Sequence, residues 1–350
     1  MNKNPKIIQN PDGSFTYFHD KEFVFDSGEV IDELFLTFET HGNIDLPAVV
    51  INHALSSNFH IKSSKKNPSP GWWEKNIGPN NHIDTNKYFV ICIGNLGSYL
   101  NCSNPSSINK KTNLKYHSNF PEVSINDIAR AQLIVLKAMN IAKIHALIGN
   151  SMGGYIALTL AMHLEHKLTK LISISSAYKS YPTNNAIHSI QRGMIINDPN
   201  WNNGNYSEKN FNGFINARKL GLISYFNPDY LNNRWDDPAD LESYLDYNAK
   251  KFCDSFAPHT YLSCLDTMDA FDINKYTNSG QSPFEKIYAL TTIIAVDSDH
   301  LCSHQQQQEL LKKLQQHKVE ANLTTVKSTK GHDAFYTDVN IAKEIAAALR

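Results

Sequence analysis

A mostly parallel, doubly wound α/β sheet is the fold that this sequence of 350 residues predicts, and three observations support the prediction. Short, nearly continuous apolar runs recur along the chain, as expected for strands that are buried on both faces. Segments with helical spacing lie between or after these runs, so strands and helices alternate. One run leads directly into Gly149-Asn150-Ser151-Met152-Gly153 and then into a helical pattern, a strand-to-helix turn found in sheets of this kind.

The composition excludes several classes of protein. With 41% hydrophobic residues, 17 Phe, 16 Tyr and 4 Trp, the chain has too many large apolar side chains to be mainly disordered. The 33 Lys and Arg residues nearly balance 34 Asp and Glu, and this net charge of -1 argues against a nucleic-acid or membrane-surface protein, which needs a basic face. No run approaches the ~20 apolar residues of a membrane span.

The expected compartment follows from two further observations. No apolar run comes after Lys3 and Lys6, so we expect no signal peptide. The cysteines are odd in number and too scattered for a disulfide framework or a structural zinc site. They are Cys92, Cys102, Cys253, Cys264 and Cys302. We therefore expect a cytoplasmic protein.

The elements follow in order along the chain. The first part mixes aromatic and polar residues between turn signals, which predicts short strands at 14–18, 23–25 and 34–39. Buried strands are predicted at 48–51, 88–93, 144–148, 171–174 and 292–296, with a last strand at 323–327. Helices are expected from Ser124, where Asp127 completes a capping box, and over 155–164, 303–317 and 338–349.

The alternation of strands and helices breaks between residues 181 and 284. This stretch is rich in Asn, Tyr, Phe and Trp and has helical patches but no strong buried-strand run. Because the sheet must resume after it, an insertion over the sheet edge explains it better than an independent domain. We predict a discontinuous catalytic core of residues 1–182 and 285–350, with a helical lid insertion at residues 183–284.

The turn around Ser151 is the most informative part of the sequence. A buried strand before G-x-S-x-G and a helix after it define a nucleophile elbow, which holds the serine in a strained conformation with its hydroxyl exposed. Gly149 and Gly153 are expected because side chains there would crowd the turn. We predict that Ser151 is a catalytic nucleophile.

A serine nucleophile needs a base and an orienting acid, which follow it in the order acid, then histidine, in this kind of fold. The strand at 292–296 ends in Asp297-Ser298-Asp299, so Asp297 and Asp299 both qualify by position. His332 lies on a loop after the last strand and is the predicted base.

Two further features complete this interpretation. An oxyanion hole needs two backbone N–H donors, one from Met152 and the other from the loop at 53–57. A competing metal site would use Asp299, His300, Cys302 and His304, but the ligand motif H-E-x-x-H of zinc hydrolases is missing from the sequence. We therefore predict no metal.

Several longer segments carry a second signal. They are His53-Ala54-Leu55-Ser56, Gly71-Trp72-Trp73-Glu74, Ile77-Gly78-Pro79, Asp84-Thr85, Phe120-Pro121, Arg130-Ala131-Gln132, Ser298-Asp299-His300-Leu301 and Gly331-His332-Asp333-Ala334-Phe335. Together with the elbow they resemble the homoserine O-acyltransferases, a family with the α/β-hydrolase fold. The resemblance spans nearly the whole chain and implies that fold, with a helical lid.

The resemblance also implies roles for particular residues. It implies that Asp299 is the acid of the triad and that Leu55 and Met152 donate to the oxyanion. The pair Ala217-Arg218 followed by Tyr225 resembles the family's amino-acid site. Arg218 would then bind the carboxylate of the acceptor, while Tyr225 and Asp333 help to hold its amino group. A forked guanidinium suits a carboxylate, and an ammonium suits an acidic partner.

The implied activity is transfer of an acetyl group from acetyl-CoA to the hydroxyl of L-homoserine, by a ping-pong acyl-serine mechanism of the methionine-biosynthesis type. The alternatives are a related transferase using L-serine or succinyl-CoA, or a serine esterase or thioesterase with the same triad. The elbow departs from the family's G-G-S-M-G-G-M-Q at Asn150, Tyr155 and Ile156. Acyl-CoA is a substrate, so no cofactor is expected. The expected partners are small molecules and a second copy of the chain through the lid, with no nucleic acid and no membrane.

Overall fold

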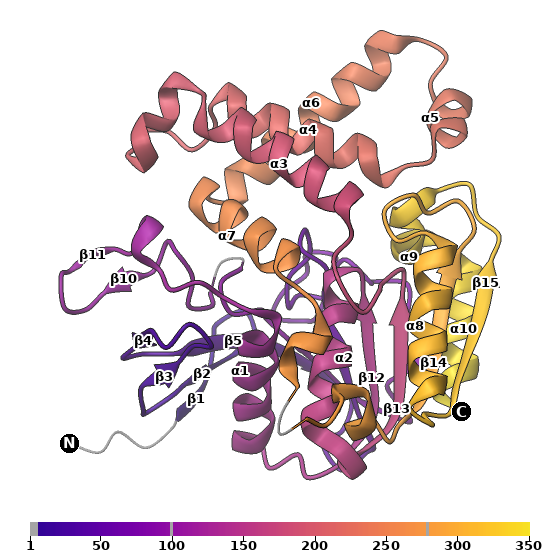
Figure 1. The fold of residues 1–350 in the computed structure, drawn as a ribbon. Helices are drawn as coiled ribbons and strands as arrows, with labels where there is room; N and C mark the ends of the chain where they lie inside the picture. Colours follow the sequence, from indigo (N-terminus) through magenta and orange to yellow (C-terminus); the bar gives the residue numbers. More distant parts are fainter. Residues whose placement is uncertain (1–5, 99–100, 278–279) are drawn as a thin grey trace.

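The structure, a computed structural model, describes residues 6–98, 101–277 and 280–350 (Figure 1). The expectation that the chain has no signal peptide concerns residues 1–6, and residues 1–5 lie outside the described ranges. A nine-stranded sheet runs through the described part in the order β1-β2-β5-β9-β6-β12-β13-β14-β15. Its strands are β1 Lys6–Gln9, β2 Phe15–Phe18, β5 Phe35–His41, β9 Phe89–Ile93, β6 Ala48–Asn52, β12 Ile144–Asn150, β13 Leu168–Ile174, β14 Leu290–Val296 and β15 Ala321–Val326.

The sheet is parallel from β9 to β15 and antiparallel from β1 to β9. The central strands β6 and β9 are buried along their whole length, as their continuous apolar sequences predict. Three short strand pairs lie outside the sheet. They are β3 Phe23–Val24 with β4 Val30–Ile31, β7 Ile77–Gly78 with β8 Ile83–Asp84, and β10 Ile108–Asn109 with β11 Leu114–Lys115. The predicted fold class is confirmed.

Helices cover both faces of this sheet. Val50 and Val49 of β6 belong to two different apolar clusters, because successive side chains of a strand point to opposite faces. Helices α1 Ile125–Ala138, α2 Met152–Leu164 and α8 His304–Gln316 contribute to the first cluster. Helices α9 Ala334–Thr337 and α10 Val339–Leu349 contribute to the second. The capping box predicted at the start of α1 is present, since Ser124 and Asp127 each accept a hydrogen bond from the other's backbone N–H.

Several elements differ from the sequence expectation, and β1 and β13 show the physical reasons. Strand β1 was not predicted, because all four of its residues are exposed and it is held by backbone pairing with β2 and not by a buried face. Strand β13 begins at Leu168, three residues before the expected start. Pairing with β12 and β14 extends the strand through polar Lys170, which faces Ala146 on one side and Leu290 on the other.

Between β13 and β14 the chain leaves the sheet and forms a group of helices that we call the cap (Figure 1). The helices are α3 Pro182–Ile196, α4 Asn212–Tyr225, α5 Pro228–Arg234, α6 Pro238–Ser255 and α7 Pro258–Asp269. Four of them carry a proline in the first turn, where its missing N–H costs nothing. The cap lies over the end of the sheet at which the parallel strands finish. The boundaries between the core and the lid insertion, placed after residues 182 and 284, stay a prediction.

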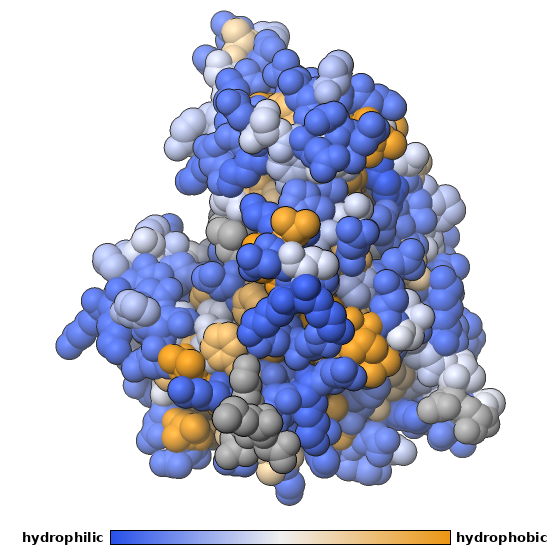
Figure 2. Space-filling view, turned by 90° about the vertical axis from the view of Figure 1, so that its left-hand side faces the viewer, coloured by the Kyte–Doolittle hydropathy of each residue, from blue (hydrophilic) through white to orange (hydrophobic). Residues whose placement is uncertain are grey.

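The surface is mainly hydrophilic on the face shown in Figure 2, where apolar side chains form only small separate groups. Large exposed apolar side chains of the cap include Ile190, Met194 and Ile196 of α3. The homodimer predicted through this part of the chain stays a prediction. Within the described residues, each helix is either too short or too polar to cross a membrane.

Candidate active site

Ser151 occupies the turn between β12 and α2 with φ 53° and ψ −124°, a conformation that is costly for a residue other than glycine. Three hydrogen bonds of its backbone hold it there. Its N–H donates to Ile174 O at 3.0 Å, and its carbonyl oxygen accepts from Gly154 N at 2.8 Å and from Ser176 Oγ at 2.9 Å. The strained elbow predicted from the sequence is therefore present.

Gly149 and Gly153 allow this turn to pack against its neighbours. A Cβ at Gly149 would lie 2.1 Å from Gly153 O, and a Cβ at Gly153 would lie 1.9 Å from Asn52 O at the end of β6. Both distances are far shorter than a van der Waals contact. The neighbouring groups are backbone, which cannot move aside as a flexible side chain can.

We predict that Gly153→Ala lowers the free energy of unfolding by at least about 3 kcal/mol, the scale of a severe overpacking. Urea denaturation followed by circular dichroism measures the change. Gly193→Ala is the matched control, because a Cβ at this α3 position would meet only Asn197 Nδ2 at 3.8 Å. Equal midpoints for the two variants would contradict the prediction.

His332 and Asp299 complete a chain of hydrogen bonds from Ser151. His332 Nε2 is 2.7 Å from Ser151 Oγ, and His332 Nδ1 is 2.8 Å from Asp299 Oδ2. Asp299 Oδ1 accepts from the backbone N–H groups of Leu301 and Cys302, each at 2.9 Å. An ionised carboxylate can only accept, so Nδ1 carries the proton and Nε2 of the neutral ring accepts from Ser151. This arrangement can remove the hydroxyl proton of a serine.

The electrostatic surroundings favour a basic imidazole. Burial alone would lower the pKa of His332, but the charge of Asp299 and its hydrogen bond raise it above the usual value, with a smaller contribution from Asp333. Burial also raises the pKa of Asp333 to about 6, although His332 and Arg218 act in the opposite direction.

The structure separates the two aspartates that the sequence left open. Asp297 Oδ1 accepts from Ser328 N at 3.0 Å and lies beside an open surface depression, away from His332. The residues weighed as a metal site also have other partners. Asp299 faces His332, His300 Nε2 lies 3.2 Å from Asn227 Nδ2, and His304 Nε2 lies 2.8 Å from Thr325 Oγ1.

Leu55 and Met152 both line the cavity in front of Ser151. Met152 is the first residue of α2, so its N–H has no partner within the helix. The loop that carries Leu55 follows β6, whose last residue packs directly against Gly153. Two backbone N–H groups from these positions could hold an oxyanion.

The predicted acceptor residues lie on one side of this cavity. Tyr225 and Asp333 line it, whereas Arg218 stands one layer behind and donates from Nη1 to Tyr225 Oη at 3.0 Å. The guanidinium of Arg218 is buried and lies over the ring of Phe252, 4.2 Å from its centre. Its Nε has no hydrogen-bond partner among the described residues.

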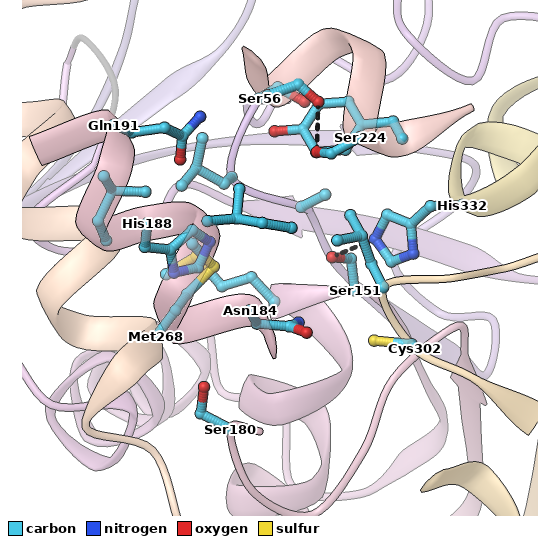
Figure 3. A pocket seen from close by; sticks show the side chains of 18 of the residues that line it. Ser56, Ser151, Ser180, Asn184, His188, Gln191, Ser224, Met268, Cys302 and His332 are labelled. Carbon is cyan, nitrogen blue, oxygen red and sulfur yellow. Dashed lines mark hydrogen bonds between the residues drawn. The ribbon is translucent and has the colours of Figure 1, made fainter. Parts of the chain in front are cut away.

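The cavity encloses about 720 Å³, part of it open to solvent, between the elbow and the cap (Figure 3). The sequence interpretation missed the residues that α3 and α7 contribute to its wall. They include Asn184, His188, Gln191, Leu265 and Met268. These residues belong to the inserted segment, where no motif marked them, and only the polar spacing along α3 could have indicated a face turned toward a ligand.

A buried polar network behind the loop that carries Leu55 was also missed. Asn52 Nδ2 donates to Gln132 Oε1 at 2.6 Å, Gln132 Nε2 donates to Asn95 Oδ1 at 3.0 Å, and Asn95 Nδ2 donates to His53 O at 3.3 Å. The network ties the start of the loop to α1 and to the segment after β9. It therefore supports the position of Leu55.

Comparisons with known proteins agree with this geometry. Residues 47–339 match the model of a protein family whose description is alpha/beta hydrolase fold. The chain is 35% identical to a serine O-succinyltransferase of Xanthomonas campestris pv. campestris over 343 residues, covering 89% of this chain and 90% of that protein. It is 36% identical to a homoserine O-acetyltransferase of Methanobrevibacter ruminantium over 330 residues, covering 88% and 67%.

A solved structure shows the same fold. The crystal structure of homoserine O-acetyltransferase from Bacillus anthracis superposes with a TM-score of 0.89 at 24% identity, covering 96% of this chain and 97% of that one. The sequence relatives and the fold agree with the resemblance noted above. The chain belongs to the homoserine O-acyltransferase family, within the α/β-hydrolase superfamily.

Proposed function

We propose that this chain is an O-acyltransferase that moves an acyl group from an acyl-CoA, through an acyl-serine at Ser151, to the side-chain hydroxyl of an amino acid. The observation that carries the proposal is the continuous hydrogen-bonded line from Ser151 through His332 to Asp299 at the floor of a cavity. The relatives named serine O-succinyltransferase and homoserine O-acetyltransferase support the class of reaction.

The first half of the reaction acylates the serine. His332 Nε2 takes the proton of Ser151 Oγ as Oγ attacks the thioester carbonyl, and the N–H groups of Leu55 and Met152 stabilise the oxyanion. When the intermediate collapses, the carbon–sulfur bond breaks and the thiolate leaves with the proton from His332. Asp299 keeps the ring in the required tautomer and stabilises its charged form.

The second half repeats these steps with the acceptor. His332 takes the proton of the amino acid's hydroxyl, whose oxygen attacks the acyl carbon, and the bond to Ser151 Oγ breaks as that oxygen regains a proton. Water could attack in the same way and release a free acid. We propose that the cap limits this loss by covering the cavity while the acyl-enzyme exists.

Two pairs of substrates are candidates, one from the sequence resemblance and one from the names of the relatives. The sequence prediction is acetyl-CoA with L-homoserine, in methionine biosynthesis. Succinyl-CoA with L-serine is the second candidate, and the names of several relatives at 33–35% identity favour it. Purified protein should be mixed with each acyl-CoA, with and without each amino acid, while thiol release is followed. Release that is equally fast with and without every amino acid would favour an esterase or thioesterase instead.

Arg218→Ala should separate the transferase from the hydrolase. We propose that Arg218, acting with Tyr225, provides the positive charge for the acceptor's carboxylate, and that Asp333 faces its ammonium. Loss of this charge should lower acceptor use by roughly 10²–10⁴-fold, the scale of breaking a buried ion pair. Acylation of Ser151 should continue, so acyl-enzyme should accumulate, and burst kinetics with and without amino acid should show it.

Arg234→Ala is the matched control for this variant. Arg234 also stacks on aromatic rings of the cap, with its guanidinium carbon 4.6 Å from the centre of Trp235, but it is not assigned to the cavity. Its loss should leave acceptor use within about threefold, as is usual for an exposed charge. If both variants lose the same activity, Arg218 acts through cap packing and not through the acceptor.

A further inference from the structure

A second histidine–carboxylate pair lies in the cap and faces the same cavity as Ser151. His188 of α3 lines the cavity, and its Nδ1 is 2.6 Å from Oδ1 of Asp269 at the end of α7. Because an ionised carboxylate only accepts, Nδ1 carries the proton of this hydrogen bond. Nε2 has no hydrogen-bond partner among the residues that the structure describes, so it is available to a ligand.

The charged groups behind His188 decide which ligand its ring can bind. Asp269 Oδ2 also accepts from Arg192, whose Nε donates to Asp266 Oδ1 at 2.7 Å. Burial alone would raise the pKa of Asp269, but the hydrogen bonds from His188 and Arg192 lower it, so this group is a carboxylate. With a neutral imidazole, His188, Arg192, Asp266 and Asp269 together carry one net negative charge and Nε2 only accepts, so this form cannot bind an anion. With a proton at Nε2 the net charge is zero, and the inference uses this form. Both ring nitrogens of that form donate hydrogen bonds.

His188 belongs to a polar stripe on the cavity side of α3. Asn184, His188 and Gln191 are spaced by four and three residues, which places them on one face of a helix. Figure 3 shows His188 and Gln191 across the cavity from Ser151 and His332, with Asn184 between the two sides. Asn184 Oδ1 is buried and has no hydrogen-bond partner within the described residues. An amide oxygen only accepts, so Asn184 can bind an anion only when the amide turns its nitrogen toward the ligand.

The remaining wall is apolar. Ile187 of α3 and Leu265 and Met268 of α7 line the cavity beside the polar stripe. A ligand on this side therefore meets apolar side chains and a histidine held by a carboxylate. An acyl group with methylene carbons and a charged end could contact both.

We propose that His188, held by Asp269 and adjacent to Asn184, binds the terminal carboxylate of a dicarboxylic acyl group such as succinyl, whose methylene carbons contact Leu265 and Met268. The inference rests on the proposed acyl transfer. The acyl chain and the amino acid must both reach Ser151 in the second half of the reaction, so they need separate walls. Tyr225 and Asp333 are assigned to the acceptor, which leaves the α3 side for the acyl chain.

Two substitutions at one position test this assignment. His188→Asn places an amide nitrogen where Nδ1 was, so it can keep the bond to Asp269 while it removes the nitrogen that faces the cavity. His188→Gln places its amide nitrogen near the position of Nε2. The measurement is kcat/KM for thiol release in the first turnover with succinyl-CoA and with acetyl-CoA, in the absence of any acceptor. His41→Asn is the matched control, because His41 Nε2 lies 2.7 Å from Glu39 Oε1 at similar exposure, outside the cavity.

We expect wild type to prefer succinyl-CoA, and His188→Asn to lower the succinyl-to-acetyl ratio of kcat/KM by about 10²-fold, as for loss of one partner of a buried charged pair. His188→Gln should recover part of the ratio, and His41→Asn should leave it unchanged. A wild type that prefers acetyl-CoA, or an unchanged ratio in both His188 variants, would overturn the inference.

Two further results would assign a different role to His188 or to Ser151. If the His188 variants raise the KM for the amino acid equally with both donors, the carboxylate held there is the acceptor's, and the inference is wrong. If neither acyl-CoA acylates wild-type Ser151, the proposed function itself fails. Circular dichroism of each variant confirms that the compared proteins are folded.

Discussion

Ser151→Ala should lower kcat for acyl transfer by roughly 10⁴–10⁶-fold, the usual consequence of removing the nucleophile of a catalytic triad. The geometry gives the reason, because Ser151 Oγ is 2.7 Å from His332 Nε2 and lies at the cavity floor. Alanine leaves the proposed oxyanion donors and the cavity walls in place but offers no atom to acylate. Steady-state thiol release measures the loss.

Mass spectrometry gives an independent reading of the same prediction. After brief mixing with acyl-CoA, the wild-type peptide that contains Ser151 should carry one acyl group, and Ser151→Ala should carry none. Ser224→Ala is a useful control, because Ser224 lines the same cavity but donates its hydroxyl hydrogen to Gly221 O. Turnover close to wild type in Ser151→Ala would end the acyl-serine mechanism.

Asp299→Asn should lower kcat by roughly 10⁴-fold while the fold is retained, by analogy with the same change in a serine protease. The amide of asparagine can donate to His332 Nδ1, which stabilises the tautomer whose Nε2 carries the proton. That nitrogen can no longer accept the proton of Ser151. Thiol release and a urea denaturation curve would show the loss of activity without a matching loss of stability.

Asp297→Asn is the natural comparison, since it changes a carboxylate two residues away. Asp297 accepts a hydrogen bond from Ser328 N and is assigned no part in proton transfer. The kcat of Asp297→Asn should therefore stay within about tenfold of the wild-type value. A larger loss in Asp297→Asn than in Asp299→Asn would reassign the acid of the triad.

Much of the fold could be predicted because the apolar sequences of the central strands indicate that these strands are buried. Residues 48–51 form a continuous apolar run and residues 144–148 a nearly continuous one, and the structure buries all of them except the half-buried His145 within β6 and β12. The elbow was equally clear, because a turn this tight tolerates few residues besides glycine at Gly149 and Gly153. Strand β1 could not be found in this way, since an exposed edge strand depends on backbone pairing and leaves no apolar pattern.

The site was predictable only where a local motif or a family resemblance marked its residues. The sequence alone could not choose between Asp297 and Asp299, because both follow β14 and the choice depends on which side chain turns toward His332. The positions of Arg218 and His188 depend on how the cap helices pack over the sheet. That packing joins residues distant in sequence, such as His188 and Asp269, and no local pattern records it.

The cap is inserted in the sequence between two strands that pair with each other, and this affects how the protein folds. Strand β13 ends at Ile174 and its neighbour β14 begins at Leu290, so the two must find each other after the intervening chain has been made. Such distant pairing slows folding, because the entropy of closing the loop is lost before the contacts form. Asp299 and His332 come later still in the sequence. During synthesis, Ser151 therefore leaves the ribosome well before Asp299 and His332 do. The newly made chain therefore passes through a stage in which Ser151 lacks Asp299 and His332, and on the proposed mechanism it can become active only when the last two strands join the sheet.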